Sequence, residues 1–298
     1  MRYYKKVMNI AKDLDFKVKD IDKEIYELNK LLSEKEEFQL DREYQKEILE
    51  KERKFLEDLK TANEVFDKRT LMTLFSLLAG KHLTEYIGIV NSGKEAVVFK
   101  ARKGKFYRAV KVYRVSTCDF KTMSKYIQGD PRFHLRKSSR RQIIHAWVEK
   151  EFRNLRRASE IINAPKARLR RENVLVMDFV GYRGIPAPKL KEFQDLDWER
   201  YYKIIRDSMK KLYEEGELIH GDLSEYNILV KDDEPVFIDF SQSVITQHPL
   251  ANPLLIRDCI NICNFFRRKK VNCNYKELYK YITGNDINPV DEAMIKQL

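Results

Sequence analysis

Apolar residues recur along the chain with two different periods, and each period predicts a different kind of element. Over residues 1–60 they recur every three or four positions, without Gly or Pro, which indicates long charged helices. A further helix is expected through residues 71–78, with Asp67 placed to cap its start and Gly80 to end it. Because this second helix is apolar on more than one face, we expect it to pack on the segment that follows.

The period changes near residue 86 to that of extended strands. Three apolar segments, separated by polar turns that contain Gly93 and Gly104, predict an antiparallel meander. After a polar insertion, helices and strands follow to the end of the chain, which we expect to be a loose tail. The expected strands cover residues 86–90, 96–101, 106–113, 174–180 and 235–240, and the expected helices cover residues 141–161, 198–215 and most of the chain from 253.

The composition allows a sizeable core and excludes several classes of protein. With 298 residues, 43% of them hydrophobic, the chain suits two domains or one large bilobal domain, and wholesale disorder is excluded. No segment approaches the ~18 apolar residues of a membrane helix, and the basic N-terminus lacks the apolar run of a secretory signal. The four cysteines lack the spacing of a zinc site, so we expect buried thiols, a reducing compartment and a cytoplasmic location.

Positive charge is concentrated in one part of the chain. The whole chain carries 58 Lys and Arg against 46 Asp and Glu, an excess of 12. Residues 131–171, the basic segment, hold 13 basic and 3 acidic residues, whereas residues 1–60 hold 15 and 16. Arginine dominates the basic segment, and its guanidinium group suits phosphate. The segment favours a partner that carries phosphate groups, and a solvated basic face is the alternative.

The first turn of the meander is a candidate phosphate-binding loop. It contains Ser92, Gly93 and Lys94, which together offer a hydroxyl group, free backbone N–H groups and a cation. An ordinary hairpin turn has the same composition, and a protein-kinase loop has three glycines where this turn has one. The turn by itself therefore does not indicate a phosphate-binding loop, and that interpretation depends on the other motifs in the chain.

Lys111 is the next candidate. It alternates with valines on the third strand, so its side chain faces away from the apolar side of that strand. A lysine that points into a cleft needs an anion, and the expected anions are the phosphates of ATP and a glutamate on a helix. We favour Glu149 as that glutamate and keep Glu151 as the second choice.

A polar loop between two apolar segments carries the most specific signal in the chain. Within it, Asp222 can orient or deprotonate an attacking hydroxyl group, and Asn227, five residues later, can ligate Mg²⁺. His220 is expected to hydrogen-bond the backbone. Seventeen residues after Asp222, Asp239 follows an apolar strand, where a carboxylate is expensive unless it holds a cation such as Mg²⁺.

These features, in this order, resemble the protein-kinase-like fold, and their details resemble the RIO kinase family. The resemblance runs from about residue 70 to 281 and rests on SGKEA at 92–96, HGDLSEYN at 220–227 and IDF at 238–240. Only 59 residues follow Asp239, without an Ala-Pro-Glu signature, so no groove for an extended peptide is expected. The chain resembles the first-type (Rio one) branch, because residues 1–60 lack the pattern of the winged helix found in the second type.

The resemblance implies an α+β fold. This is the bilobal protein-kinase-like (RIO) fold with a truncated C-terminal lobe and a helical N-terminal extension. The expected parts are the extension over residues 1–65, the N-terminal lobe with its preceding helix and basic insertion over 66–180, the C-terminal lobe over 181–285 and the loose tail over 286–298.

The resemblance also implies a role for each matching residue. Lys111 would hold the phosphates, Asp222 would be the catalytic aspartate, and Asn227 and Asp239 would bind Mg²⁺. In this family the metal-binding aspartate can itself accept the γ-phosphoryl group, so Asp239 would become an aspartyl phosphate. The residues expected around adenine are Met177, behind the ring, and Asp178 and Val180, through their backbone groups.

The implied activity is that of an ATP- and Mg²⁺-dependent serine/threonine kinase and ATPase that acts in late maturation of the small (40S) ribosomal subunit. The implied partners are pre-ribosomal small-subunit particles and their RNA, which we expect to meet the basic segment, with no membrane and no DNA. Two alternatives stay open. A small-molecule phosphotransferase of the aminoglycoside or choline kinase kind shares the His-Gly-Asp-x-x-x-x-Asn loop, and a non-catalytic ribosome-binding module would not need the four polar residues intact.

Overall fold

The computed structural model describes residues 66–133 and 139–295, and the helical extension expected over residues 1–65 lies outside them. The chain divides into two compact units. Of the described residues, 66–87 and 102–104 belong to one unit, and 88–101, 105–133 and 139–295 belong to the other. The domain boundaries expected at residues 65, 180 and 285 stay predictions.

In the smaller unit, helix α4 (Lys68–Ala79) begins and ends where the sequence predicts. The side chain of Asp67 accepts a hydrogen bond from the backbone N–H of Thr70 at 2.8 Å, so it caps the first turn. After the helix the chain turns back, and the hydroxyl group of Tyr86 donates to the carbonyl of Leu74 at 3.0 Å. The predicted packing of this helix on the segment after it is therefore confirmed.

Five strands form one sheet in the order β1–β2–β3–β5–β4, and the first three are the predicted meander. Strand β3 pairs antiparallel with β5, with Lys111 opposite Leu175. The edge strand β4 was not predicted, and its alternate arginines, Arg168 and Arg170, are exposed. The strands are β1 (Glu85–Ser92), β2 (Ala96–Lys103), β3 (Phe106–Tyr113), β4 (Ala167–Arg171) and β5 (Val174–Asp178).

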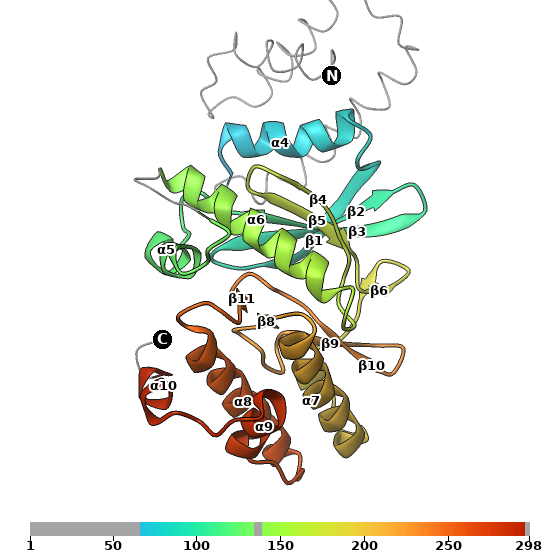
Figure 1. The fold of residues 1–298 in the computed structure, drawn as a ribbon. Coiled ribbons are helices and arrows are strands. Elements are labelled where there is room, and N and C mark those ends of the chain that lie inside the picture. Colours follow the sequence, from blue (N-terminus) through green and yellow to red (C-terminus); the bar gives the residue numbers. More distant parts are fainter. Residues whose placement is uncertain (1–65, 134–138, 296–298) are drawn as a thin grey trace, which may run out of the picture. The chain divides into compact units, whose positions relative to one another are not determined.

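Helix α6 (Arg140–Ala158) packs on β4 and β5 and crosses in front of them in Figure 1. It begins with a capping box, in which Ser139 and Gln142 each accept a hydrogen bond from the other's backbone N–H. Its buried face follows helical spacing and includes Ile144, Val148, Glu151, Leu155 and Ala158. The predicted helix over 141–161 is confirmed, and the shorter helix α5 (Phe120–Gln128) packs against it.

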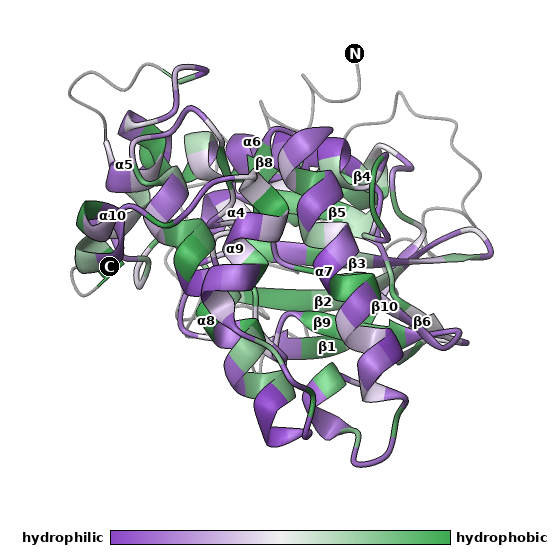
Figure 2. Cartoon of the chain, turned by 60° about the horizontal axis from the view of Figure 1, so that its bottom comes forward, coloured by the Kyte–Doolittle hydropathy of each residue, from purple (hydrophilic) through white to green (hydrophobic). Residues whose placement is uncertain are grey.

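Helices α7, α8 and α9 form the C-terminal lobe, in which α9 packs on both of the others. In Figure 2 hydrophilic and hydrophobic colours alternate along α7 and α8, as expected of helices that bury one side. None of the described helices is long and apolar enough to cross a membrane, and all four cysteines are buried, as predicted. The helices of this lobe are α7 (Trp198–Glu214), α8 (Ala251–Arg268), α9 (Tyr275–Thr283) and α10 (Pro289–Met294), with the 3-10 helix η1 (Leu190–Glu192).

Helix α10 corrects the expectation of a wholly loose tail. The side chain of Asn288 accepts a hydrogen bond from the N–H of Val290, and Pro289 occupies the first turn, where its missing N–H group costs nothing. The cap and the proline favour the start of the helix, and hydrogen bonds from Asn252 to Asp291 and from Tyr275 to Glu292 hold it against the rest of the lobe.

Short antiparallel strand pairs close the polar loops of the C-terminal lobe. In one pair, Ile228 at the start of β9 lies opposite Phe237 at the end of β10, and this places Asn227 beside the residues that precede Asp239. In the other, Ile219 on β8 lies opposite Val244 on β11, which closes the base of the loop that begins at His220. The strands are β6 (Gly181–Tyr182), β7 (Ile185–Pro186), β8 (Leu218–Ile219), β9 (Ile228–Lys231), β10 (Glu234–Phe237) and β11 (Val244–Ile245).

Gly221 is required at the start of the polar loop for two reasons. Its φ of +78° lies in the left-handed region, and a Cβ atom placed there would lie 2.7 Å from the carbonyl oxygen of Gln242. Gly284, after α9, has a similar φ of +74°, but a Cβ atom added to it would meet nothing within 4 Å among the described residues. The two glycines therefore share a similar positive φ and differ in the space around a Cβ atom.

We predict that Gly221→Ala lowers the free energy of unfolding by more than Gly284→Ala does. The left-handed conformation alone should cost each variant about 1 to 2 kcal/mol, and the contact with Gln242 adds to the loss only at residue 221. Denaturant titration of the two variants measures the difference. Equal losses would contradict the steric argument.

Candidate active site

Lys111 lies at the centre of a group of charges in which Lys111 and Glu151 are buried and the side chain of Asp239 is 39% exposed. Its Nζ atom donates to Glu151 Oε1 at 2.8 Å and to Asp239 Oδ1 at 2.7 Å, and the hydroxyl of Tyr113 donates to Glu151 Oε2 at 2.5 Å. The side chains of Lys111 and Glu151 are only 9% and 1% exposed. Burial by itself lowers the pKa of Lys111, but the carboxylates of Asp239 and Glu151 raise it well above its usual value. The lysine is therefore a fixed cation.

The choice of Glu149 as the partner of Lys111 was wrong, and the second choice, Glu151, makes the contact. Glu149 instead pairs with Arg153 at 2.5 Å and with Arg170. Side chains two positions apart on a helix point in directions about 200° apart around the helix axis. Only one of the two glutamates can therefore face the sheet. Glu151 belongs to the buried face of α6, which could be read from the apolar residues at 144, 148 and 155.

The loop between β8 and β9 brings Asp222 and Asn227 together. The Nδ2 atom of Asn227 donates to Asp222 O at 2.8 Å and to Asp222 Oδ2 at 3.2 Å. Burial, followed by the nearby charge of Asp239, raises the pKa of Asp222 to about 6, although Arg257 opposes this shift. His220 is buried, and its Nε2 atom lies 3.0 Å from the carbonyl of Ile238, so the predicted structural role is confirmed.

Asp239 has an unusual backbone and a stabilised charge. Its φ of +64° lies in the left-handed region, where residues other than glycine are uncommon and cluster at functional sites. Burial would raise the pKa of its carboxyl group, but Lys111 outweighs burial and lowers that pKa to about 2. The backbone N–H of Ser241 also donates to Asp239 Oδ1 at 3.3 Å. Asp239 is therefore ionised throughout the physiological pH range.

The oxygen atoms left over at this site suit a divalent cation. Among the described residues, Asp239 Oδ2 and Asn227 Oδ1 have no hydrogen-bond donor, because Lys111 and Ser241 both use Oδ1 of Asp239 and Asn227 donates through its nitrogen. Carboxylate and amide oxygens are the ligands that Mg²⁺ prefers in proteins. The donor set therefore fits Mg²⁺.

In the turn between β1 and β2, groups that were predicted to be free for phosphate already have hydrogen-bond partners within the protein. The N–H of Gly93 is not free for a phosphate, because it donates to Ala96 O at 2.9 Å. The Oγ atom of Ser92 accepts from Arg114 Nη2 at 2.8 Å. Lys94 is exposed, and Thr117 donates to its carbonyl at 2.5 Å.

The residues expected around adenine lie at the end of β5 and directly after it. The N–H of Asp178 donates to Lys166 O at 3.0 Å, so only its carbonyl could serve a base. The carboxylate of Asp178 pairs with Arg168 at 2.6 Å. Within the described residues the N–H of Val180 has no acceptor, and Met177 is half-buried beside the core.

Asp258 is a structural residue of this site that the sequence reasoning missed. Its two carboxylate oxygens accept from the backbone N–H groups of Gly221 at 2.7 Å and Leu223 at 2.8 Å, on either side of Asp222. Burial raises the pKa of Asp258 to about 7, against the effect of these two hydrogen bonds. The available signal was an acidic residue within the apolar stretch of helix α8, where a carboxylate must have a partner. Arg257, beside it, donates to Gly221 O.

The fold and the site together define a class of protein. A five-stranded sheet carries Lys111, a helix carries its partner Glu151, and two loops of a helical lobe supply Asp222, Asn227 and Asp239. This is the arrangement of an ATP-dependent phosphotransferase with the protein-kinase-like fold.

Known proteins narrow this class to one family. Residues 97–278 match the family model described as the RIO domain. "RIO-type serine/threonine-protein kinase Rio1" from Methanocaldococcus jannaschii is 91% identical over 293 residues, which cover 98% of this chain and 99% of that one. "Serine/threonine-protein kinase RIO1" from Homo sapiens is 38% identical over 238 residues, which cover 77% of this chain and 42% of that one. The chain therefore belongs to the RIO kinase family.

A solved structure supports the same fold. The Rio2 kinase from Chaetomium thermophilum, described as an ADP/Mg²⁺-phosphoaspartate complex, matches with a TM-score of 0.54 and 22% identity over 75% of this chain and 69% of that one. At this identity the likeness shows the fold alone. Together with the family, it confirms the predicted bilobal RIO fold. The 91% identity to Rio1 confirms the predicted first-type branch. The enzyme is an ATP-dependent protein kinase, so neither the small-molecule phosphotransferase nor the non-catalytic module is retained.

The two glutamates of α6 provide a matched pair of variants. We predict that Glu151→Gln lowers kcat/KM for ATP by about 10- to 100-fold, because Lys111 loses the charge that holds it in position. Glu149→Gln should change kcat/KM by less than about twofold, since exposed arginines are its partners and such ion pairs are weak. Steady-state ATP turnover measures both. A larger loss with Glu149→Gln would restore the original choice.

Proposed function

We propose that this kinase uses ATP with Mg²⁺, transfers the γ-phosphoryl group to its own Asp239, and acts in the cytoplasm in late maturation of the small ribosomal subunit. The observation that carries the proposal is the direct contact of Lys111 with Asp239 at 2.7 Å. It joins the phosphate-binding cation to the carboxylate that would accept the phosphoryl group.

Each residue of the site has a role in this proposal. Lys111, held by Glu151, binds the phosphates of ATP, and Asp239 and Asn227 supply oxygen ligands for Mg²⁺. Mg²⁺, when bound, neutralises charge on the phosphate oxygens. Asp222, which shares a hydrogen bond with Asn227, accepts a proton from an attacking hydroxyl group or water.

The contact with Lys111 supports Asp239 as the phosphoryl acceptor. Its carboxylate lies 2.7 Å from the lysine that would bind the phosphates, and its lowered pKa keeps it ionised, whereas the raised pKa of Asp222, about 6, suits proton transfer. In the transfer step a carboxylate oxygen of Asp239 forms a bond to the γ-phosphorus, the bond from that phosphorus to the bridging oxygen breaks, and ADP leaves. Water then hydrolyses the acyl phosphate. This step releases inorganic phosphate and regenerates the carboxylate of Asp239. The phosphoaspartate of the Rio2 complex is a precedent in a protein with the same fold.

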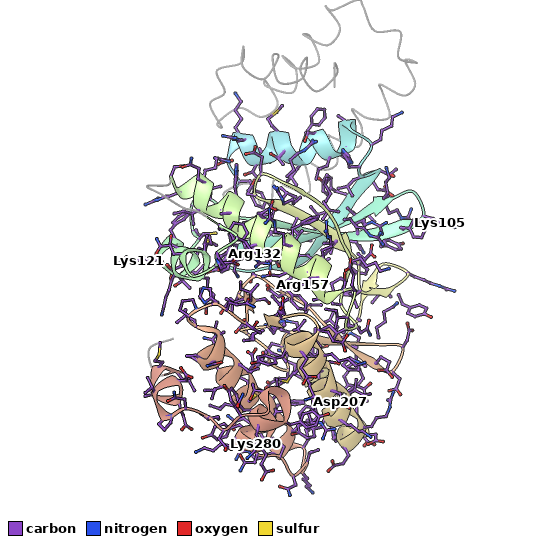
Figure 3. All side chains as sticks on the ribbon, viewed as in Figure 1. Lys105, Lys121, Arg132, Arg157, Asp207 and Lys280 are labelled. Atoms are coloured by element: carbon purple, nitrogen blue, oxygen red, sulfur yellow. The ribbon has the colours of Figure 1, made fainter. Side chains whose placement is uncertain are left out.

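The basic segment remains the proposed RNA-binding surface, with less free charge than its composition suggests. Figure 3 labels two of its arginines, Arg157 in the last turn of helix α6 and Arg132 in the segment before that helix. Several of its arginines form ion pairs, namely Arg132–Asp130, Arg153–Glu149, Arg157–Glu217, Arg168–Asp178 and Arg170–Glu149. The last four arginine side chains are 37–49% exposed, and exposed ion pairs contribute only about 0 to 1 kcal/mol. Phosphates of RNA can therefore compete for them.

We predict that incubation with γ-labelled ATP yields a phosphoprotein whose label hydroxylamine removes. Acyl phosphates react with hydroxylamine, whereas phosphoserine does not. Asp239→Asn should abolish both the label and turnover, and Asp222→Asn should lower turnover by about 100-fold or more. Label that resists hydroxylamine and maps to Ser139 would instead indicate ordinary autophosphorylation.

We predict that binding to small-subunit particles weakens steeply as the salt concentration rises. The logarithm of the association constant should fall linearly with the logarithm of the salt concentration. The slope should be roughly −0.9 per duplex phosphate contact or roughly −0.7 per single-strand contact. Replacing Arg168, Arg170 and Arg171 with Ala should weaken binding and flatten the slope. Arg200→Ala, which removes an exposed arginine paired with Asp233 and Glu234 outside the basic segment, is the control and should keep the slope. Equal slopes for all variants would remove the basic segment from the interface.

A further inference from the structure

Lys150 is a buried lysine beside the active site that the proposed reaction does not use. It follows Glu149 on α6, precedes Glu151, and is 0% exposed. Its Nζ atom donates to two backbone carbonyls, Ser241 O at 3.1 Å and Ser243 O. Among the described residues no carboxylate lies within ion-pair distance of it.

An amino group in this place needs a reason. The rings of Trp147 and Tyr126 lie 5.1 and 5.7 Å from Nζ. Burial lowers the pKa of Lys150 to about 7, and the charge of Asp130, which opposes this shift, is already paired with Arg132 at 2.6 Å. Burying such a group is expensive, and an apolar side chain of similar length would fill the same space at lower cost. What only the amino group supplies is N–H donors directed at one loop.

That loop is the segment directly after Asp239. Besides the two bonds from Lys150, the carbonyl of Ser243 accepts from Asn154 Nδ2 at 2.7 Å, and Ser243 Oγ donates to His220 O at 2.8 Å. The N–H of Ser241 donates to Asp239 Oδ1. The donors on α6 therefore fix the peptide groups of residues 241–243, and these in turn fix the carboxylate of Asp239.

We propose that Lys150 is a positioning residue for the Mg²⁺ site. It holds the loop over residues 241–243 so that Asp239 keeps its left-handed backbone and presents its free Oδ2 atom to the metal. Successive residues of α6 thus act on Asp239 from two sides, Glu151 through Lys111 and Lys150 through the loop. This inference rests on the proposed use of Mg²⁺ by Asp239 and Asn227.

The experiment compares Lys150→Met with Ile144→Ala on the same helix. Ile144 is also 0% exposed but belongs to the apolar core, so its truncation lowers stability without removing a donor to the loop. Binding of Mn²⁺ to the ADP complex is followed by electron paramagnetic resonance, and thermal unfolding is measured for each variant. Turnover as a function of Mg²⁺ concentration is a further readout.

We expect Lys150→Met to weaken Mn²⁺ binding by about 10-fold or more, as is usual when a residue that orients a metal ligand is lost. Ile144→Ala should lower the melting temperature and leave Mn²⁺ affinity unchanged. Asn154→Ala removes the second donor to Ser243 O and should weaken Mn²⁺ binding in the same direction by a smaller factor, which keeps the test open if Lys150→Met does not fold.

The same measurements separate a failure of the role of Lys150 from a failure of the proposed Mg²⁺ site. Wild-type Mn²⁺ affinity in Lys150→Met, or equal weakening in Ile144→Ala, overturns the role of Lys150 and leaves the proposed function intact. A wild-type protein that binds no Mn²⁺ in the presence of ADP overturns the proposed metal site itself, and the role of Lys150 with it.

Discussion

The buried ammonium group of Lys111 joins segments that lie 40 and 128 residues away in the chain. It contacts Glu151 on α6 and Asp239 in the loop after β10, so the sheet, the helix and the C-terminal lobe meet at one charge. Removing one member of a buried ion pair leaves the other without a partner, which costs about 3 to 5 kcal/mol. The contact is therefore a constraint on the fold as well as a catalytic feature, and the site exists only when all these segments are in place.

Other polar groups extend this constraint to the loops. Asp258 binds the backbone on both sides of Asp222, and the donors of Lys150 and Asn154 bind the backbone after Asp239. Asp222 and Asp239 are thus each held, through their neighbouring peptide groups, by a buried residue of a helix. Charges fixed before the substrate arrives need no reorganisation during the reaction, which is how enzymes stabilise transition states most effectively.

Most of the secondary-structure elements and the central polar residues of the site could be predicted from the sequence. The meander, helix α6 and the helical C-terminal lobe follow from apolar periodicity, which is a local property that neighbouring residues set. The identities of Lys111, Asp222, Asn227 and Asp239 as the polar residues of the site were also predictable. Lys111 alternates with valines inside a strand, and the other three stand where a polar loop meets an apolar strand. A charged or amide group in such a position is expensive to bury unless it has a partner. The sequence alone also determined the family.

Only the tertiary structure showed which ion-pair and hydrogen-bond partners the charged side chains have. Periodicity places both glutamates on one helix, but only the direction in which that helix faces the sheet selects Glu151 over Glu149. The roles of Asp258 and Lys150 depend on loops that lie more than 30 residues away in the chain, so no local pattern could assign them. The arginines of β4 likewise looked unopposed until folding brought Asp178 and Glu149 beside them. The physical reason is common to all of these cases: composition sets which charges the chain carries, but the energy of a charge depends on its distance from other charges, and distances between remote residues are set only when the chain folds.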